Sequence, residues 1–209
     1  MAEGLESFKL PLKWKSGAGL MSKMLLSDPE IMRIIIQSFI DVDVPPDSYS
    51  VAPIEWADTK GVYTLYTSQN TSNEKFIPIL AAIQEEVNQA TILETIERST
   101  LVYENFRILP TVLVISIKSS SRLKDDGEFS VADDSFLMQC ESKFWANKCY
   151  LFFPDDLVNM NTTNTFTPAF FALCHFISNP NKLFTLSHTS NTQTISLTCE
   201  AKTHKWTQQ

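Results

Sequence analysis

The sequence predicts one α/β domain with a mixed sheet, in which the elements follow the order α–β–β–β–α–β and a C-terminal elaboration extends that core. Three observations support this prediction. Apolar residues recur at helical spacing in two segments, and short runs rich in β-branched and aromatic residues lie between them. The 209 residues, of which 44% are hydrophobic and 20% charged, are also typical of a globular chain with a sizeable core.

The N-terminal part of the chain is predicted to hold two helices. Residues 20–26 are expected to form the first, which is short. The second begins where Ser27 or Asp28 can cap a helix, Pro29 fits the first turn and Glu30 complements the positive end of the helix dipole. Isoleucine and phenylalanine side chains then share one helical face, which we expect to be buried.

Three strands are predicted next. Residues 50–57, 62–67 and 76–83 are rich in strand-favouring residues, and Gly61 is expected in the turn between the first two. The third strand is apolar almost throughout, which indicates that helices cover both of its faces.

A long helix and a further strand follow. The helix is predicted over residues 85–106, and the strand over residues 111–118, whose TVLVISIK run is the strongest strand signal of the chain. A strand, a helix and an apolar strand in succession indicate a parallel crossover. In this interpretation Glu85 and Glu86 lie in the first turn of the helix and complement its dipole.

The C-terminal region is less regular. Residues 149–153 are predicted to form a strand, residues 168–178 a helix and residues 194–200 an edge strand. Residues 129–144 give mixed signals, so no element is predicted there.

One domain accounts for this order, because no internal repeat or low-complexity linker divides the chain. Residues 1–27 are expected to be an N-terminal arm or short helix, and residues 28–209 a single domain. Its core is expected over residues 28–120 and its elaboration over residues 121–209.

Composition excludes several classes of function. The chain has only five glycines and contains neither G-x-G-x-x-G nor G-x-x-x-x-G-K-[ST], which excludes glycine-rich nucleotide sites. Its 17 basic and 24 acidic residues give a net charge of −7, which argues against a generally basic nucleic-acid surface.

The expected location follows from signals that the sequence lacks. No apolar run approaches the roughly 18 residues of a membrane span, and the N-terminal residues show no signal-peptide pattern. We therefore expect an intracellular protein, in the cytoplasm or nucleus, without a membrane partner. Its four cysteines show no C-x-x-C spacing and are expected to be reduced and structural.

One stretch points to a candidate chemistry. Metal-dependent phosphodiester cleavage needs carboxylates on adjacent strands, which hold Mg²⁺ and activate a water. The run PILAAIQEEVN at residues 78–88, then Arg98, Tyr103 and Glu104, then LPTVLVI, resembles the PD-(D/E)XK nuclease superfamily, and within it the Rpn-type recombination-promoting nuclease/transposase group. The resemblance covers residues 28–120 and implies a restriction-endonuclease-like αβββαβ core with a mixed sheet.

The metal-binding positions of that family depart from its pattern in this chain. Gln84 matches the Gln of the family's Glu-any-Gln motif at the end of the third strand, but the Glu position falls on Ala82. The preceding strand, residues 62–67, should supply a further acid and contains none. Three explanations of this departure are open. The domain has lost catalysis, the assigned register is shifted, or Ala82 is a deliberate substitution.

Other acids are candidates for catalysis in place of the missing ones. Asp58 lies in the predicted turn before the second strand, Glu85 and Glu86 follow Gln84 directly, and Glu30 lies on an N-terminal helix. Each acid also has a structural interpretation, as a turn residue, a dipole partner or a helix cap.

Basic residues supply the candidate nucleic-acid contacts. Arg98 matches the arginine that the family carries on its long helix. Lys13, Lys15 and Lys23, with Trp14 among them, form a basic and aromatic N-terminal segment that can contact a nucleic acid. Ordinary solvated side chains are the alternative for all of these residues.

The resemblance, with its departures, therefore predicts a catalytically degenerate nuclease-like domain that binds a protein, which the net acidity favours, or a nucleic acid. No cofactor is expected. One alternative is an active DNA endonuclease in which Mg²⁺ is held by Asp58 with Glu85 or Glu86. The other is an interaction domain without nuclease ancestry.

Overall fold

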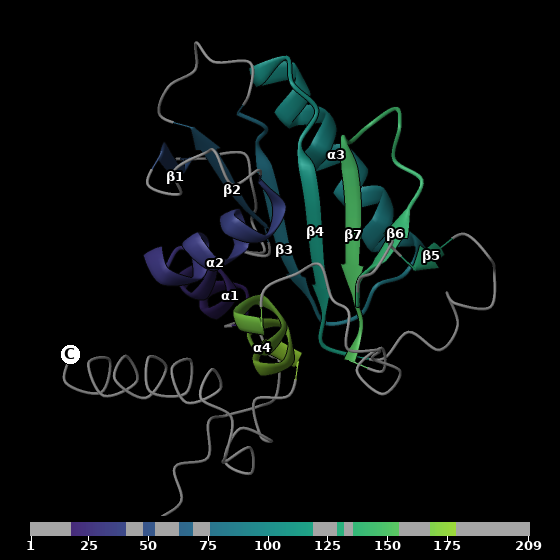
Figure 1. Cartoon of the computed structure of the whole chain (residues 1–209). Helices are drawn as coiled ribbons and strands as arrows, with labels where there is room; N and C mark the ends of the chain where they lie inside the picture. Colours follow the sequence, from purple (N-terminus) through teal and green to yellow (C-terminus); the bar gives the residue numbers. More distant parts are fainter. Residues whose placement is uncertain are drawn as a thin grey trace, which may run out of the picture.

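The computed structural model of the chain describes residues 18–40, 48–52, 63–68, 76–118, 129–131, 136–154 and 168–178. These residues form a mixed α/β fold, in which helices cover both faces of a seven-stranded sheet (Figure 1). The predicted α/β class with a mixed sheet is confirmed.

The sheet is built from strands β1 (Tyr49–Val51), β2 (Tyr63–Ser68), β3 (Ile79–Gln84), β4 (Thr111–Ser116), β5 (Phe129–Val131), β6 (Met138–Cys140) and β7 (Lys148–Phe152). Their order across the sheet is β1-β2-β3-β4-β7-β6-β5. β1, β2 and β3 are antiparallel neighbours, whereas β3, β4 and β7 run parallel to one another. β6 and β5 complete the sheet in antiparallel pairing.

In the part of the chain that the structure describes, four helices accompany this sheet: α1 (Ala18–Leu26), α2 (Pro29–Phe39), α3 (Gln89–Phe106) and α4 (Pro168–Ser178). α1, α2 and α4 lie on one face of the sheet and α3 lies on the other (Figure 1). From α2 to β4 the elements follow the predicted order, and α3 connects the parallel strands β3 and β4.

β3 separates two apolar cores. All of its residues are buried, which confirms that both faces of this strand are covered. Ile79, Ala81 and Ile83 belong to the core beneath α1, α2 and α4, whereas Leu80 and Ala82 belong to the core beneath α3. This division follows from the two-residue period of a strand, which points successive side chains to opposite faces.

α1, the short helix expected near the N-terminus, is part of the domain core. Leu26 at its end is fully buried, and its backbone carbonyl accepts a 2.7 Å hydrogen bond from the hydroxyl of Tyr66 on β2. Burial raises the pKa of Tyr66, so its hydroxyl keeps the proton that it donates. This contact attaches α1 to the sheet.

α3 begins later than predicted, at Gln89 and not at Glu85. A capping box precedes it, because Thr91 Oγ1 accepts from the backbone N–H of Asn88 at 2.8 Å and Asn88 Oδ1 accepts from that of Thr91 at 3.1 Å. These bonds satisfy the first donors of the helix. The capping signal therefore lies in Asn88 and Thr91, and the first turn of α3 contains no acid.

The residues just before α3 continue the sheet. The carbonyl groups of Gln84 and Glu85 accept hydrogen bonds from the N–H groups of Ile117 and Lys118, at 3.0 and 2.9 Å. Because this backbone pairs with the chain after β4, Glu85 cannot belong to a helix. The predicted role of Glu85 and Glu86 in the first helical turn is therefore wrong.

Other predicted elements are found with shifted ends. β1 includes residues 50 and 51 of the strand predicted over residues 50–57, of which residues 53–57 lie outside the described residues. Residues 129–144, for which no element was predicted, include β5 and β6. β7 and α4 lie where a strand and a helix were predicted. Gly61 and the predicted edge strand over residues 194–200 lie outside the described residues.

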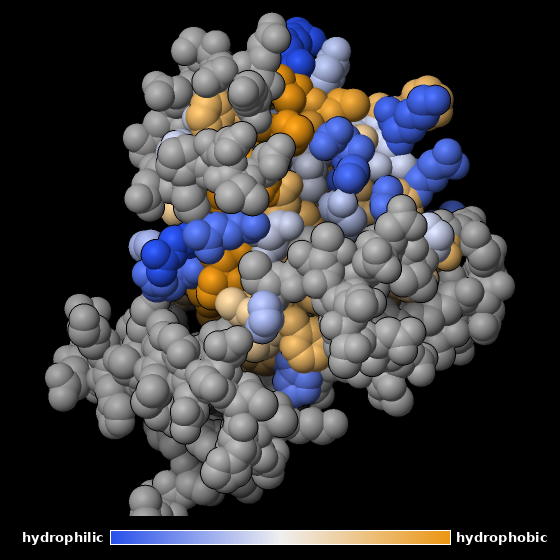
Figure 2. All heavy atoms as spheres, in the orientation of Figure 1, coloured by the Kyte–Doolittle hydropathy of each residue, from blue (hydrophilic) through white to orange (hydrophobic). Residues whose placement is uncertain are grey.

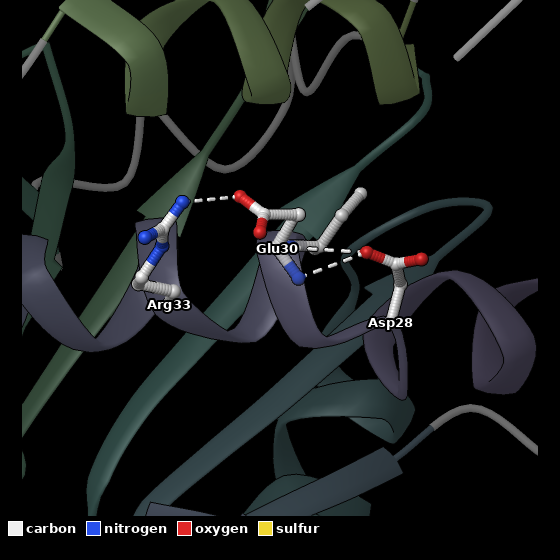
Figure 3. Close-up of polar contacts among 4 residues, drawn as sticks. Asp28, Glu30 and Arg33 are labelled. Atoms are coloured by element: carbon white, nitrogen blue, oxygen red, sulfur yellow. Dashed lines mark hydrogen bonds and ion pairs between the residues drawn. The ribbon is translucent and has the colours of Figure 1, made fainter. Parts of the chain in front are cut away.

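Of the two predicted caps, Asp28 is the residue that caps α2. Its Oδ1 accepts hydrogen bonds from the backbone N–H groups of Glu30 at 3.0 Å and Ile31 at 3.4 Å (Figure 3). Glu30 also forms an exposed ion pair with Arg33 one turn along the helix. The space-filling view shows hydrophilic atoms where α2 lies, consistent with a helix that buries only its other side (Figure 2).

Asp28→Ala should lower the free energy of unfolding by about 1 kcal/mol, because the first N–H groups of α2 lose their acceptor. Urea denaturation followed by circular dichroism measures this change. Asp28→Asn keeps a side-chain acceptor and should lose much less. Equal losses in the two variants would show that the cap does not stabilise α2.

Candidate functional site

The candidate site lies where β2 begins and β3 ends. Because these strands are antiparallel, the two ends meet at one edge of the sheet, and Tyr63 stands opposite Ala82. On its other side Ala82 pairs with Val114 of β4. The position that the resemblance assigns to a metal-binding glutamate is thus an alanine between a tyrosine and a valine.

Three polar side chains next to Ala82 form a hydrogen-bonded series, which we call the Gln84–Tyr63–Thr95 chain. Gln84 Nε2 donates to the hydroxyl of Tyr63 at 2.9 Å, and this hydroxyl lies 3.0 Å from Thr95 Oγ1 on α3. Thr95 Oγ1 donates to the carbonyl of Thr91 at 2.7 Å. Since a threonine hydroxyl has one proton, Tyr63 must be the donor to Thr95, and the chain has a single direction.

Water has little access to this chain. The exposed fraction is 7% for Gln84, 2% for Tyr63 and 1% for Thr95, and Ala82 is fully buried. A carboxylate at such a position would lose its hydration, which is costly unless a metal or a hydrogen-bonding partner replaces the water. The Gln84–Tyr63–Thr95 chain joins three uncharged side chains by hydrogen bonds, so it stabilises the contact between β2, β3 and α3.

Metal binding needs a different set of groups. Mg²⁺ is held chiefly through carboxylate oxygens, substrate phosphates and water. Within the described residues, no group of three or more His, Cys, Asp or Glu side chains is placed to hold a metal ion. Tyr63 and Val114, the two residues that pair with Ala82, bring no carboxylate to this position.

Charged side chains begin one residue beyond Gln84. Glu85 Oε1 lies 2.7 Å from Lys118 Nζ, and both side chains are about half exposed, at 51% and 57%. The hydrogen bond and charge of Glu85, together with the charge of Glu86, raise the pKa of Lys118. These three residues, which we call the edge cluster, lie just past the C-terminal ends of β3 and β4.

The candidate nucleic-acid contacts are not brought together. Arg98 lies on α3 and is partly buried, whereas Lys23 lies on α1 and is exposed. Because α1 and α3 cover opposite faces, the sheet separates these two side chains (Figure 1). Lys13 and Lys15 lie outside the described residues, as does the candidate catalytic residue Asp58.

Glu30 lies away from the candidate site. α2 packs on the core that contains Ala81, whereas Ala82 and the side chain of Tyr63 belong to the core beneath α3. Glu30 is exposed and paired with Arg33 on the outer side of α2 (Figure 3). The structure therefore does not bring this acid to Gln84.

Two contributors to this region were not identified from the sequence, Thr95 and Lys118. Thr95 shares the buried side of α3 with Ser99 and Val102. Their spacing of four and three residues is the helical signal that could have placed Thr95 against the sheet. Lys118 ends a strand-like run, but its pairing with Glu85 depends on the register of β3 and β4.

Comparisons with known proteins give no match, whether with family models, with curated proteins or with solved structures. Among the described residues, no helix has both the length and the apolar character needed to cross a membrane.

Tyr63→Phe should lower the free energy of unfolding by about 1–3 kcal/mol, because it removes the hydroxyl that joins Gln84 to Thr95 in a buried site. Chemical denaturation measures the loss. Tyr103→Phe is the matched control, since Tyr103 lies on α3 with 42% of its surface exposed. We expect the control to change stability by less than about 0.5 kcal/mol. Unchanged stability in Tyr63→Phe would contradict the structural role of the chain.

Proposed function

We propose that this chain is a PD-(D/E)XK nuclease-like domain that has lost catalysis and acts by binding, with a protein partner favoured over a nucleic acid. The observation that supports this most directly is Ala82. The resemblance assigns a metal-binding glutamate to this position, where the alanine stands opposite Tyr63 on the neighbouring strand and is buried beneath α3.

The order of the elements supports the nuclease-like part of the proposal. β1, β2 and β3 form an antiparallel meander, after which α3 leads to β4, parallel to β3. Helices cover both faces of the sheet. The resemblance implies an αβββαβ order, which several folds share. Since a fold hosts many functions, the support for lost activity comes from the residues of the site.

The wild-type protein should not cleave plasmid DNA, single-stranded DNA or RNA in the presence of Mg²⁺ or Mn²⁺. The physical reason is that Ala82 and Tyr63 give the two strands no carboxylate to hold the metal. Gel electrophoresis of the products measures cleavage, and Asp58→Asn purified in parallel detects contaminating nuclease. Metal-dependent cleavage by the wild type that Asp58→Asn abolishes would overturn the proposal.

Surface properties favour a protein partner. The net charge of −7 opposes general attraction to nucleic acid. Leu93 and Tyr103 on α3 are exposed, as is Phe144 in the turn between β6 and β7. This turn contacts α3, because the hydroxyl of Ser99 donates to the carbonyl of Trp145. Aromatic side chains are enriched in protein interfaces, so the outer side of α3 with this turn is the surface that we assign to the partner.

Binding to nucleic acid is expected to be absent or weak. Fluorescence anisotropy with labelled duplex DNA, single-stranded DNA and RNA should show no saturable binding at physiological salt with protein up to about 100 μM. This limit reaches the weak end of the roughly 10⁻⁴ to 10⁻⁶ M range of dissociation constants for non-specific binders. Arg98→Ala is the matched variant. Micromolar binding that weakens with salt and with Arg98→Ala would replace the protein partner with a nucleic acid.

The edge cluster favours a second candidate, the active Mg²⁺-dependent endonuclease. Glu85 and Glu86 are exposed beside Lys118, and β2, which Asp58 precedes in the sequence, begins at the same edge of the sheet. Asp58 with Glu85 or Glu86 would then hold the metal. Calorimetric titration with Mn²⁺ distinguishes the candidates: the endonuclease requires binding that Asp58→Asn removes, whereas the inactive domain requires none.

A further inference from the structure

β6 and β7 bring two cysteines into direct opposition. Cys140 ends β6 and pairs with Cys149 of β7 in the antiparallel register. Residues directly opposite each other in such a pair have Cα atoms about 4.5–5.5 Å apart, within the roughly 4.4–6.8 Å that a disulfide spans. Both side chains belong to the core beneath α3, so they lie on the same face of the sheet. The sulfur atoms therefore need little backbone movement to form a bond.

We propose that Cys140 and Cys149 are a site of reversible oxidative modification, which hydrogen peroxide closes to a disulfide across β6 and β7. This inference rests on the pairing of the two strands and on the burial of the two side chains. It is independent of the proposed binding function.

The two cysteines have different roles in this reaction. Cys140 keeps 8% of its surface exposed, whereas Cys149 is fully buried, so a small oxidant meets Cys140 first. The hydrogen bond from Cys149 lowers the pKa of Cys140. The same hydrogen bond and burial raise the pKa of Cys149. Because the thiolate is the nucleophile, Cys140 attacks the peroxide and Cys149 resolves the product.

The reaction proceeds in two balanced steps. The thiolate of Cys140 attacks one peroxide oxygen and breaks the O–O bond, which leaves a sulfenic acid on Cys140 and releases hydroxide. The thiolate of Cys149 then attacks Cys140 Sγ, forms the S–S bond and expels the sulfenic oxygen as hydroxide. The protons of the two thiols convert both hydroxides to water. Two thiols are oxidised by two electrons, and one peroxide is reduced to two waters.

The disulfide would close a ring around the turn between β6 and β7. The backbone N–H of Asn147 in this turn donates to the carbonyl of Pro110 at 2.9 Å, just before β4. Phe144 in the same turn is 92% exposed. Oxidation therefore fixes covalently a surface turn that already contacts the core strands.

Cys174 provides an internal control. It lies on α4 in the core on the other face of the sheet and is fully buried. Burial raises the pKa of Cys174 well above its usual value. The described residues pair it with no other cysteine, so we expect it to stay a thiol under the same treatment.

The experiment treats the full-length reduced protein with hydrogen peroxide, alkylates the remaining thiols in denaturant and maps the peptides by mass spectrometry. Trypsin cleaves after Lys143 and Lys148, between the two cysteines, and chymotrypsin separates Cys149 from Cys174. We expect peptides linked through Cys140 and Cys149, released by dithiothreitol. The oxidised protein should also unfold about 5–10 °C higher, as a short disulfide loop predicts for a chain of this size.

Variants test the assigned roles. Cys149→Ala should leave a sulfenic acid on Cys140 that reacts with dimedone, whereas Cys140→Ala should leave Cys149 unlabelled. Cys174→Ala should form the linked peptides as the wild type does. Links through Cys174 or Cys199, links between chains, or no link at all would overturn the proposal. The wild-type peptide map decides the site even if one alanine variant does not fold.

Discussion

The covering of β3 on both faces is the constraint on which the rest of the structure depends. This strand pairs antiparallel with β2 and parallel with β4, and all of its residues are buried. Its alternate side chains therefore belong to two separate cores, one beneath α1, α2 and α4 and one beneath α3. Every group placed on β3 must tolerate the loss of water, which explains why its polar member, Gln84, is neutral and hydrogen-bonded.

The same constraint accounts for the chemistry of the candidate site. An acid can serve at the end of a buried strand only if a metal, a cation or solvent replaces its hydration. Here Ala82 carries no charge, and the hydroxyl of Tyr63 bridges Gln84 and Thr95. One residue further, Glu85 is exposed and pairs with Lys118. The boundary between neutral packing and charged surface thus falls between Gln84 and Glu85.

Local signals predicted most elements of the fold, because helix caps, strand runs and apolar periods act over a few residues. Asp28 marked the start of α2, and the apolar run of β3 indicated its burial. The start of α3 was misplaced because sheet pairing with the chain after β4 holds Glu85, which no local pattern reveals. The same limit hid the contact of Tyr63 with Thr95 and the opposition of Cys140 and Cys149. Both contacts depend on register, and a shift of one residue turns a side chain to the other face.

The remaining reactive groups occupy opposite ends of the central strands. The edge cluster of Glu85, Glu86 and Lys118 follows the C-terminal ends of β3 and β4. The turn between β6 and β7 instead contacts the chain before β4, through Asn147 and Pro110. β4 and β7 pair in parallel between these two ends of the sheet. A covalent bond between Cys140 and Cys149 therefore lies near the N-terminal end of β7, whereas the edge cluster lies at the opposite end of the strands. Oxidation of the two cysteines should therefore leave binding at the edge cluster unchanged. It should affect contacts made through the turn that carries Phe144, because the disulfide closes that turn.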